Sequence, residues 1–138
     1  MKSAPDDEVC VQWSETLRMY HTASSELESE LQSQHQLGLS EFEVLQALSA
    51  RGRDTEGPKV RMKDLETEMY LSQSALSRTV SRLEKVGLVA RGECDFDRRA
   101  IFVWLTDEGW ARWTAASPTH RSVLEKYFAP SLEGSARV

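Results

Sequence analysis

Apolar residues recur at helical intervals over most of the chain, and the longest such stretch comes first. Between residues 9 and 36 there is no Pro or Gly, and an apolar stripe advances by alternating steps of four and three, as in a heptad repeat. The stripe comprises Trp13, Leu17, Tyr20, Ser24, Leu27 and Leu31. It predicts a long helix that packs either on the chain's own core or on a second subunit. Glu26, Glu28 and Glu30 on the polar face favour the second subunit.

A second helix is predicted over Leu39–Ala50, where apolar residues again have helical spacing. The residues assigned to the core are Phe42, Leu45 and Leu48. Ser40 and Glu43 have the spacing of a capping box, in which each side chain bonds a backbone amide of the first turn. Ser40 is therefore expected to cap this helix.

A pair of helices joined by a tight turn follows a glycine-containing loop. Val60–Met62 is expected to pair as a minimal strand, and Lys63–Tyr70 to form a short helix before a turn at Leu71. Ser72 then caps a helix over 73–86. Two helices joined in this way, the second with a polar outer face, predict a helix-turn-helix.

The helix over 73–86 separates apolar and polar residues onto two faces. Its inner stripe is Leu76, Val80, Leu83 and Val86. Its outer face is Gln73, Ser74, Ser77, Arg78, Ser81, Arg82 and Lys85. Serine is a poor helix former, so helix stability does not explain three serines on one face. Short hydroxyls let a helix lie close in a major groove, and Arg binds guanine bidentately, so the face predicts DNA contact. A solvated surface is the alternative. Gly87 is expected to end the helix, with Leu88 closing back onto Leu83.

Two strand-like runs, Leu88–Cys94 and Ala100–Leu105, flank a charged turn. The second run alternates, and one face of it carries Ile101, Val103 and Leu105. Arg98 and Arg99 in the turn suit a minor groove, where narrow A·T tracts concentrate negative potential. Asp97 is placed to hold the Arg99 guanidinium. An ordinary charged turn is the alternative.

The last part of the chain is predicted to form two helices. Thr106 caps the first, which runs to about Ser117 because Pro118 follows. Thr119–Phe128 forms the second. Together these elements predict a mostly helical fold with a small β-hairpin, and 138 residues are enough for one domain.

Charge is distributed unevenly along the chain. The net charge of −5 excludes a strongly basic, non-specific nucleic-acid binder. Residues 51–103 nevertheless hold eleven Lys and Arg against nine Asp and Glu, which leaves six against thirteen elsewhere. A focused basic surface in the middle of the chain is compatible with this pattern.

The sequence predicts a cytoplasmic protein without a structural metal. It has no apolar run of the roughly 20 residues that span a bilayer, and the N-terminus lacks the layout of a signal peptide. Cys10 and Cys94 stand far apart with no zinc-ligand spacing, so neither a disulfide nor a zinc site is expected.

The stretch Leu71–Gly109 holds the most informative features in a fixed order. In LSQSALSRTVSRLEKVGLVARGECDFDRRAIFVWLTDEG, the Ser-capped helix, the Gly-Leu-Val stop, Asp-x-Arg and Leu-Thr-x-x-Gly follow one another. With this order the chain resembles the MarR family of winged-helix regulators. The wider layout from Trp13 to Phe128 is also similar to that family.

The resemblance implies one domain over 1–138, mostly α with a small β-wing (α+β). A winged helix-turn-helix lobe at 38–105 would bind DNA, and helices at 9–36 and 106–129 would form the dimer. A homodimer would bind double-stranded DNA at a pseudo-palindromic operator and act as a transcriptional repressor. Carried over by position, the DNA-binding residues are Gln73, Ser74, Ser77, Arg78, Ser81, Arg82, Asp97, Arg98 and Arg99.

The resemblance also implies a small-molecule effector, often phenolic or otherwise anionic, held between the dimer helices and the DNA-binding lobe. The candidates for lining its pocket are Trp13, Tyr20, His21 and Trp113. Core or interface packing is the alternative for each of them.

The sequence departs from the family pattern in two places. The final long helix that completes the dimer interface in many relatives is short or absent after Pro130. Cys10 lies upstream of the position of the reactive cysteine in peroxide-sensing members, which falls near Leu17, so redox sensing is not the expectation.

Two other classes of function compete with a DNA-binding regulator. The acidic net charge is compatible with a winged-helix protein–protein interaction module that does not bind DNA. The chain is not expected to be an enzyme or to hold a cofactor or metal. His21, His35 and His120 lack metal-ligand spacing, and there is no phosphate-binding loop or nucleophile elbow.

Overall fold

A computed structural model describes residues 5–51, 60–94 and 97–128, with the backbone alone described for Pro5, Asp6, Cys94 and Asp97–Arg99. Five helices and three short strands make up this part of the chain. In order they are α1 (Pro5–His35), α2 (Leu39–Ser49), β1 (Val60–Arg61), α3 (Met62–Glu68), α4 (Gln73–Lys85), β2 (Val89–Cys94), β3 (Asp97–Leu105) and α5 (Asp107–Tyr127). The predicted mostly helical fold with a small β-wing is confirmed.

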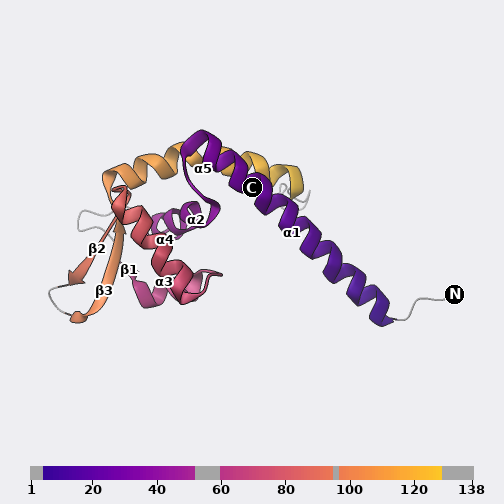
Figure 1. Cartoon of the computed structure of the whole chain (residues 1–138), viewed down its shortest axis with the longest axis horizontal. Coiled ribbons are helices and arrows are strands. Elements are labelled where there is room, and N and C mark those ends of the chain that lie inside the picture. The colour runs from indigo at the N-terminus through magenta and orange to yellow at the C-terminus, as the bar shows by residue number, and fades with distance from the viewer. Residues whose placement is uncertain (1–4, 52–59, 95–96, 129–138) are drawn as a thin grey trace, which may run out of the picture.

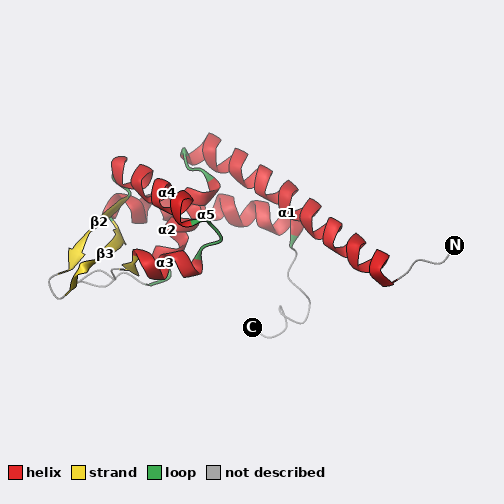
Figure 2. Ribbon diagram, turned by 60° about the horizontal axis from the view of Figure 1, so that its bottom comes forward, coloured by secondary structure: helices red, strands yellow, loops and turns green. Residues whose placement is uncertain are grey.

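The elements form a lobe with one helix projecting from it (Figure 1). The lobe holds α2, α3, α4 and the small sheet, while α5 runs alongside the C-terminal half of α1 (Figures 1 and 2). At 31 residues α1 is about 46 Å long, and its N-terminal half extends away from the rest of the chain. No helix in the described ranges is long and apolar enough to cross a membrane.

One continuous core joins the lobe to the C-terminal end of α1. Every helix contributes to it. Its buried residues include Leu31, Leu37, Phe42, Leu45, Leu48, Leu65, Leu76, Val80, Leu83, Leu88, Val89, Val103 and Ala116. The core residues predicted for the second helix, and three of the four predicted for the inner stripe of 73–86, are therefore confirmed.

The start of α2 differs from the prediction. Gly38, not Ser40, is the capping residue, and its amide donates to Glu41 Oε1 at 2.6 Å. The next amide, that of Leu39, donates to Glu28 Oε1 of α1 at 2.8 Å. The prediction of a Ser40–Glu43 capping box was wrong, because the carboxylate that bonds the capping amide is Glu41, three residues after Gly38. Glu28 supplies a further acceptor from another helix, which local spacing does not reveal.

The two ends of α4 match the prediction. Ser72 Oγ accepts from the amide of Ala75 at 3.1 Å. At the other end Gly87 adopts a φ of 83°, and the amide of Leu88 returns to the Leu83 carbonyl at 2.9 Å. Val86 is the exception. It is 67% exposed instead of belonging to the inner stripe, because it is the capping residue at which the chain leaves the helix.

The sheet is antiparallel with β3 in the centre, in the order β1-β3-β2. The β2–β3 pairing runs from Val89↔Leu105 to Glu93↔Ile101, then shifts register to Cys94↔Asp97. The second strand of the hairpin thus begins at Asp97, earlier than predicted, and Asp95 and Phe96 lie outside the described residues.

Ile101 and Val103, predicted to share one face of this strand, differ in burial. Ile101 is 43% exposed, whereas Val103 is fully buried. The reason lies in β1, which pairs with β3 only at Val60↔Val103 and Arg61↔Phe102. Beyond that short strand nothing in the described residues pairs with β3 on that side, and Ile101 borders an open groove.

The Leu-Thr-x-x-Gly motif joins the hairpin to α5. Thr106 Oγ1 donates to the Gly87 carbonyl at 2.6 Å and accepts from the amide of Gly109 at 3.0 Å. A Cβ on Gly109 would lie 2.0 Å from the Leu88 carbonyl oxygen, so no larger residue fits there. The motif therefore holds the end of α4, the start of β2 and the start of α5 together.

The predicted break at Pro118 was wrong, because α5 is one helix of 21 residues with Pro118 inside it. A proline in a helix interior costs about 3 kcal/mol. Contacts with α1 on both sides offset that cost. Arg112 donates to the His35 carbonyl at 2.9 Å before the proline, and after it Tyr127 donates to Glu26 Oε1 at 2.5 Å.

Candidate nucleic-acid interface

The outward face of α4 is polar, exposed and almost free of acidic groups. Six side chains on it are exposed, namely Gln73, Ser74, Ser77, Arg78, Arg82 and Lys85. Ser81 is half-buried. The hydroxyls of Ser72 and Ser74 lie 3.3 Å apart at the N-terminal end of the face. Nearly every residue of this helix that was predicted to bind DNA is thus exposed to solvent on the outward face.

The two arginines on this face have different surroundings. Arg78 has no hydrogen-bond or ion-pair partner within the described part of the chain. Arg82, one turn later, lies with Nε 3.3 Å from Glu41 Oε2 and with Nη2 3.3 Å from Thr79 Oγ1. Because Glu41 also accepts from the Gly38 amide, Arg82 is tied to the first turn of α2.

Ser81 and Glu84 connect α4 to the hairpin. Arg91 of β2 donates from Nη2 to Ser81 Oγ at 3.1 Å and from Nε to Glu84 Oε1 at 2.9 Å. The carboxylate of Glu84, the one acidic residue of α4, is therefore paired with an arginine of its own chain. By bonding both side chains, the Arg91 guanidinium sets the position of the hairpin relative to α4.

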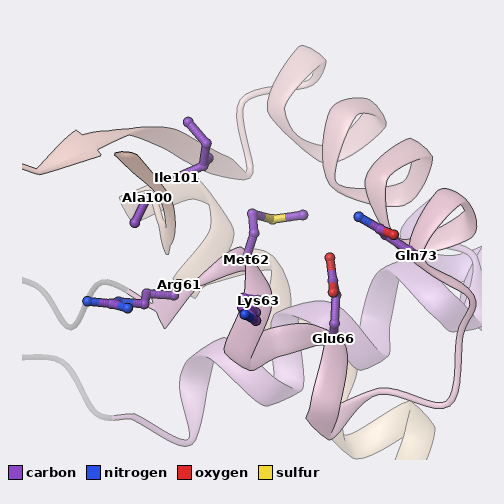
Figure 3. Close-up of a pocket in the computed structure, with 7 residues that line it drawn as sticks. All are labelled: Arg61, Met62, Lys63, Glu66, Gln73, Ala100 and Ile101. Carbon is purple, nitrogen blue, oxygen red and sulfur yellow. The ribbon is translucent and has the colours of Figure 1, made fainter. Parts of the chain in front are cut away.

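A groove of about 590 Å³ lies between the start of α3, the N-terminus of α4 and β3 (Figure 3). Arg61 and Lys63 bring two positive charges to it, and Glu66 brings one carboxylate. Gln73 enters from α4, and Ile101 from β3. The Arg61 guanidinium lies 5.8 Å from the centre of the Phe102 ring, which is a cation–π distance.

The wing residues are described only in part. The backbone of Asp97–Arg99 belongs to β3, at the end of the hairpin farthest from α5 (Figure 1). The side chains of Asp97, Arg98 and Arg99 lie outside the described residues, so the predicted Asp97–Arg99 pair stays a prediction.

The four candidates for an effector pocket do not lie together. Tyr20 borders a cavity of about 900 Å³ between α1, α2 and α5. Trp113 borders a neighbouring cavity of about 760 Å³, which shares His120, Leu124 and Phe128 with the first, and its indole N–H donates to Gln46 Oε1 at 2.7 Å. Trp13 and His21 are exposed on α1 and border neither cavity.

Comparison with known proteins places this architecture in a family. Residues 35–100 match the model of the MarR family. AbsC, a MarR family transcriptional regulator from Streptomyces coelicolor, has 30% sequence identity and a TM-score of 0.79, with 99% of this chain and 90% of AbsC covered. The chain belongs to the MarR family. Sco3205, a MarR family regulator from the same organism solved in complex with DNA, has 25% identity and a TM-score of 0.81 over 99% of this chain and 84% of that one.

Another relative is matched over a shorter stretch. The transcriptional regulator PecS of Dickeya dadantii is 30% identical over 79 residues, which are 57% of this chain and 46% of PecS. The chain thus aligns with less than half of the length of PecS.

Within this MarR-family chain, the motifs that carried the resemblance are mainly structural. Gly87, Thr106 and Gly109 hold elements together and do not form the outward face of α4. Arg61 and Lys63 were not identified from the sequence as residues of the site. They lie on either side of Met62, where the short helix α3 begins without a capping side chain. No group of three or more His, Cys, Asp or Glu within the described ranges is arranged to hold a metal ion.

Proposed function

We propose that the protein is a sequence-specific DNA-binding transcriptional regulator whose α4 enters the major groove. The observation that carries this proposal is the outward face of α4, where hydroxyl, amide and guanidinium groups are exposed and the single carboxylate of the helix is neutralised by Arg91. Ser and Gln donate to phosphates and base edges, and the guanidinium of Arg78, which has no partner among the described residues, can bind guanine. The complex of its relative Sco3205 with DNA supports the same assignment.

Further phosphate contacts would come from the groove beside α4 and from the wing. Arg61 and Lys63 lie next to Gln73 and extend the positive surface from α4 towards β3. Asp97, Arg98 and Arg99 continue it along β3 by their place in the sequence. The proposal assigns major-groove contacts to Gln73, Ser74, Ser77 and Arg78, and minor-groove contacts to Arg98 and Arg99.

The protein would act as a homodimer. Trp13 and Tyr20 are 62% and 68% exposed on the projecting half of α1, together with Val9, Val11, Leu17 and Met19. Large apolar side chains gathered on one helix end support a subunit contact. In a two-fold dimer the two α4 helices would meet half-sites about one helical turn, ~34 Å, apart on a pseudo-palindromic operator. Residues 38–105 would then form the DNA-binding lobe, and α1 and α5 the dimer.

Selection of bound duplexes from a random pool by the full chain tests the proposal. A palindromic consensus is the expected result, and it would report operator, symmetry and half-site spacing together. On the selected duplex, Arg78→Ala is expected to weaken binding by about tenfold to a hundredfold and to relax the preference for guanine at the base pair that it contacts. Arg121→Ala on α5 is the matched control, since it removes an exposed arginine away from α4.

Two outcomes would contradict the proposal. If no duplex is enriched and no salt-sensitive binding occurs, a protein–protein interaction module becomes the better assignment. If Arg78→Ala and Arg99→Ala both bind the selected duplex like the parent, α4 and the wing are not the DNA surface. Repression and effector control belong to the same proposal, and a reporter placed behind the selected operator should be expressed less when the protein is present.

A further inference from the structure

The largest cavity described above lies between α1, α2 and α5, away from the outward face of α4. Its volume of about 900 Å³ is within the range of small-molecule sites, roughly 300–1,000 Å³. Apolar side chains such as Leu27 and Leu124 form much of its wall. The cavity borders three helices at once, so an occupant would contact both the projecting helix and the lobe.

The charges in this cavity are negative. Among the described residues that line it, Glu15 of α1 and Glu43 of α2 are the only formally charged ones, and none is Lys or Arg. Glu43 has no hydrogen-bond or ion-pair partner in the described part of the chain. Although it reaches solvent through the open cavity, the surrounding protein desolvates the carboxyl and raises its pKa. A cation bound in the cavity would stabilise a carboxylate in this position, whereas a bound anion would be repelled by it.

Aromatic rings line the same space. Tyr20 and Phe128 border the cavity with 68% and 54% of their surface exposed. The His120 ring stacks on Phe42 with the ring centres 4.4 Å apart. Burial, together with the nearby Arg121, lowers the pKa of His120, so the imidazole is neutral near pH 7 and adds no positive charge. Ring faces attract cations within about 6 Å, most strongly where water is excluded.

We propose that this cavity binds a hydrophobic monocation, such as an aromatic amine or a quaternary onium ion, and rejects aromatic acids of similar size. Glu43 is the counter-ion, Glu15 adds to the negative potential, and Tyr20 and Phe128 cover the apolar body of the ligand. The ligand class is opposite in charge to the phenolic anions that the family resemblance implies. The proposed role of the ligand as effector rests on the proposed DNA-binding function, whereas its binding does not.

The cavity has a physical connection to the DNA face. Glu43 is two residues from Glu41, which holds Arg82 of α4 at the first turn of α2. A ligand that moves α2 relative to α1 therefore changes the support of α4. The ligand would thus affect DNA binding by shifting the packed helix α2, without contacting α4 itself.

Tetraphenylphosphonium and tetraphenylborate, which share shape and differ in charge, provide the test. Titration calorimetry on the full chain without DNA is expected to show at least tenfold tighter binding of the phosphonium ion. Glu43→Gln should weaken phosphonium binding by about tenfold, the effect of losing one partly desolvated counter-ion. Glu93→Gln on β2 makes the same charge change far from the cavity and should leave the affinity unchanged. Glu15→Gln is a second variant, expected to weaken binding by a smaller factor.

Three results would overturn the inference. The first is equal or tighter binding of tetraphenylborate. The second is an equal effect of Glu43→Gln and Glu93→Gln, which would mean that phosphonium affinity depends only on the net charge of the protein. The third is binding of neither ion, the result if a second copy of the chain fills the cavity. None of these concerns DNA, so a failure here leaves the outcome of the operator selection untouched.

Discussion

The helices α1 and α4 are both amphipathic, but they expose opposite kinds of surface. In α1 the residues left in solvent include several large apolar ones, with Trp13 and Tyr20 more than half exposed. In α4 they are hydroxyls, an amide and guanidinium groups, while Leu76 and Leu83 are fully buried. Exposed apolar surface is stabilised by removal from water, at about 25 cal/mol per Å², whereas exposed donors are already satisfied by water. The two helices therefore suit different partners. The exposed apolar residues of α1 suit a protein surface, and the outward face of α4 suits a charged polar partner.

The contrast also exists inside α1. Leu31 is fully buried against the lobe, while Leu17, two heptads earlier on the same stripe, is 45% exposed. Both leucines satisfy the same sequence pattern. The difference comes from α5 and α2, which reach the C-terminal half of α1 and not its projecting end (Figure 2).

The largest predicted effect tests this division with one substitution at two places. Leu31→Ala should lower the free energy of unfolding by about 2–5 kcal/mol at every protein concentration, because it opens a cavity in the core. Leu17→Ala should leave the lobe intact and weaken self-association, so that its destabilisation appears only where the dimer is populated. Chemical unfolding at several protein concentrations, with analytical ultracentrifugation, separates the two. Unchanged self-association in Leu17→Ala would remove this residue from the interface.

Local patterns in the sequence were enough for the features whose partners are near in the chain. Ser72 bonds an amide three residues away, and Leu88 closes onto the carbonyl of Leu83. At the start of α2 the Glu28 acceptor was missed because it comes from another helix, and the continuity of α5 was missed because α1 supports it across Pro118. The intrinsic helix preferences of single residues are overridden wherever packing between elements contributes more to stability.

The candidate site divides in the same way. Exposure of Ser74, Ser77 and Arg78 follows from helical periodicity alone. The engagement of Arg82 by Glu41 joins residues 41 positions apart, and the groove beside Arg61 forms only where three elements meet. Sequence periodicity shows which side a residue occupies but not what it touches there.

A smaller effect is predicted for Arg82, which distinguishes support of α4 from contact with DNA. Arg82→Ala should weaken binding to the selected duplex by about two- to fivefold, in keeping with the 0.2–1 kcal/mol of an exposed ion pair. Because Glu41 already holds the guanidinium, the slope of log affinity against log salt should stay that of the parent. Mobility-shift titrations at several salt concentrations give both quantities.

Glu41→Gln provides the matched variant for that prediction. If Arg82 acts through Glu41, the two substitutions together should cost no more than either alone, since each removes the same contact. Additive losses, or a reduced salt slope in Arg82→Ala, would instead mean that Arg82 binds a phosphate directly.

The smallest predicted effect concerns the anchored end of α1. Glu26 accepts hydrogen bonds from Lys126 and from Tyr127 of α5, and these bonds lower the pKa of its carboxyl below the usual 4.5. A group with a depressed pKa in the folded state contributes stability above its unfolded pKa and loses it as the pH falls through the folded value. The unfolding midpoint in urea should therefore drop between about pH 5 and pH 3, and more steeply in the parent than in Glu26→Gln. Glu30→Gln, on the same helix one turn further on, should retain the steep dependence of the parent. Equal slopes in all three proteins would show that this contact does not hold α1 to α5, and the anchored end of α1 would then depend on the apolar packing of Leu27 and Leu31 and on the Arg112–His35 contact.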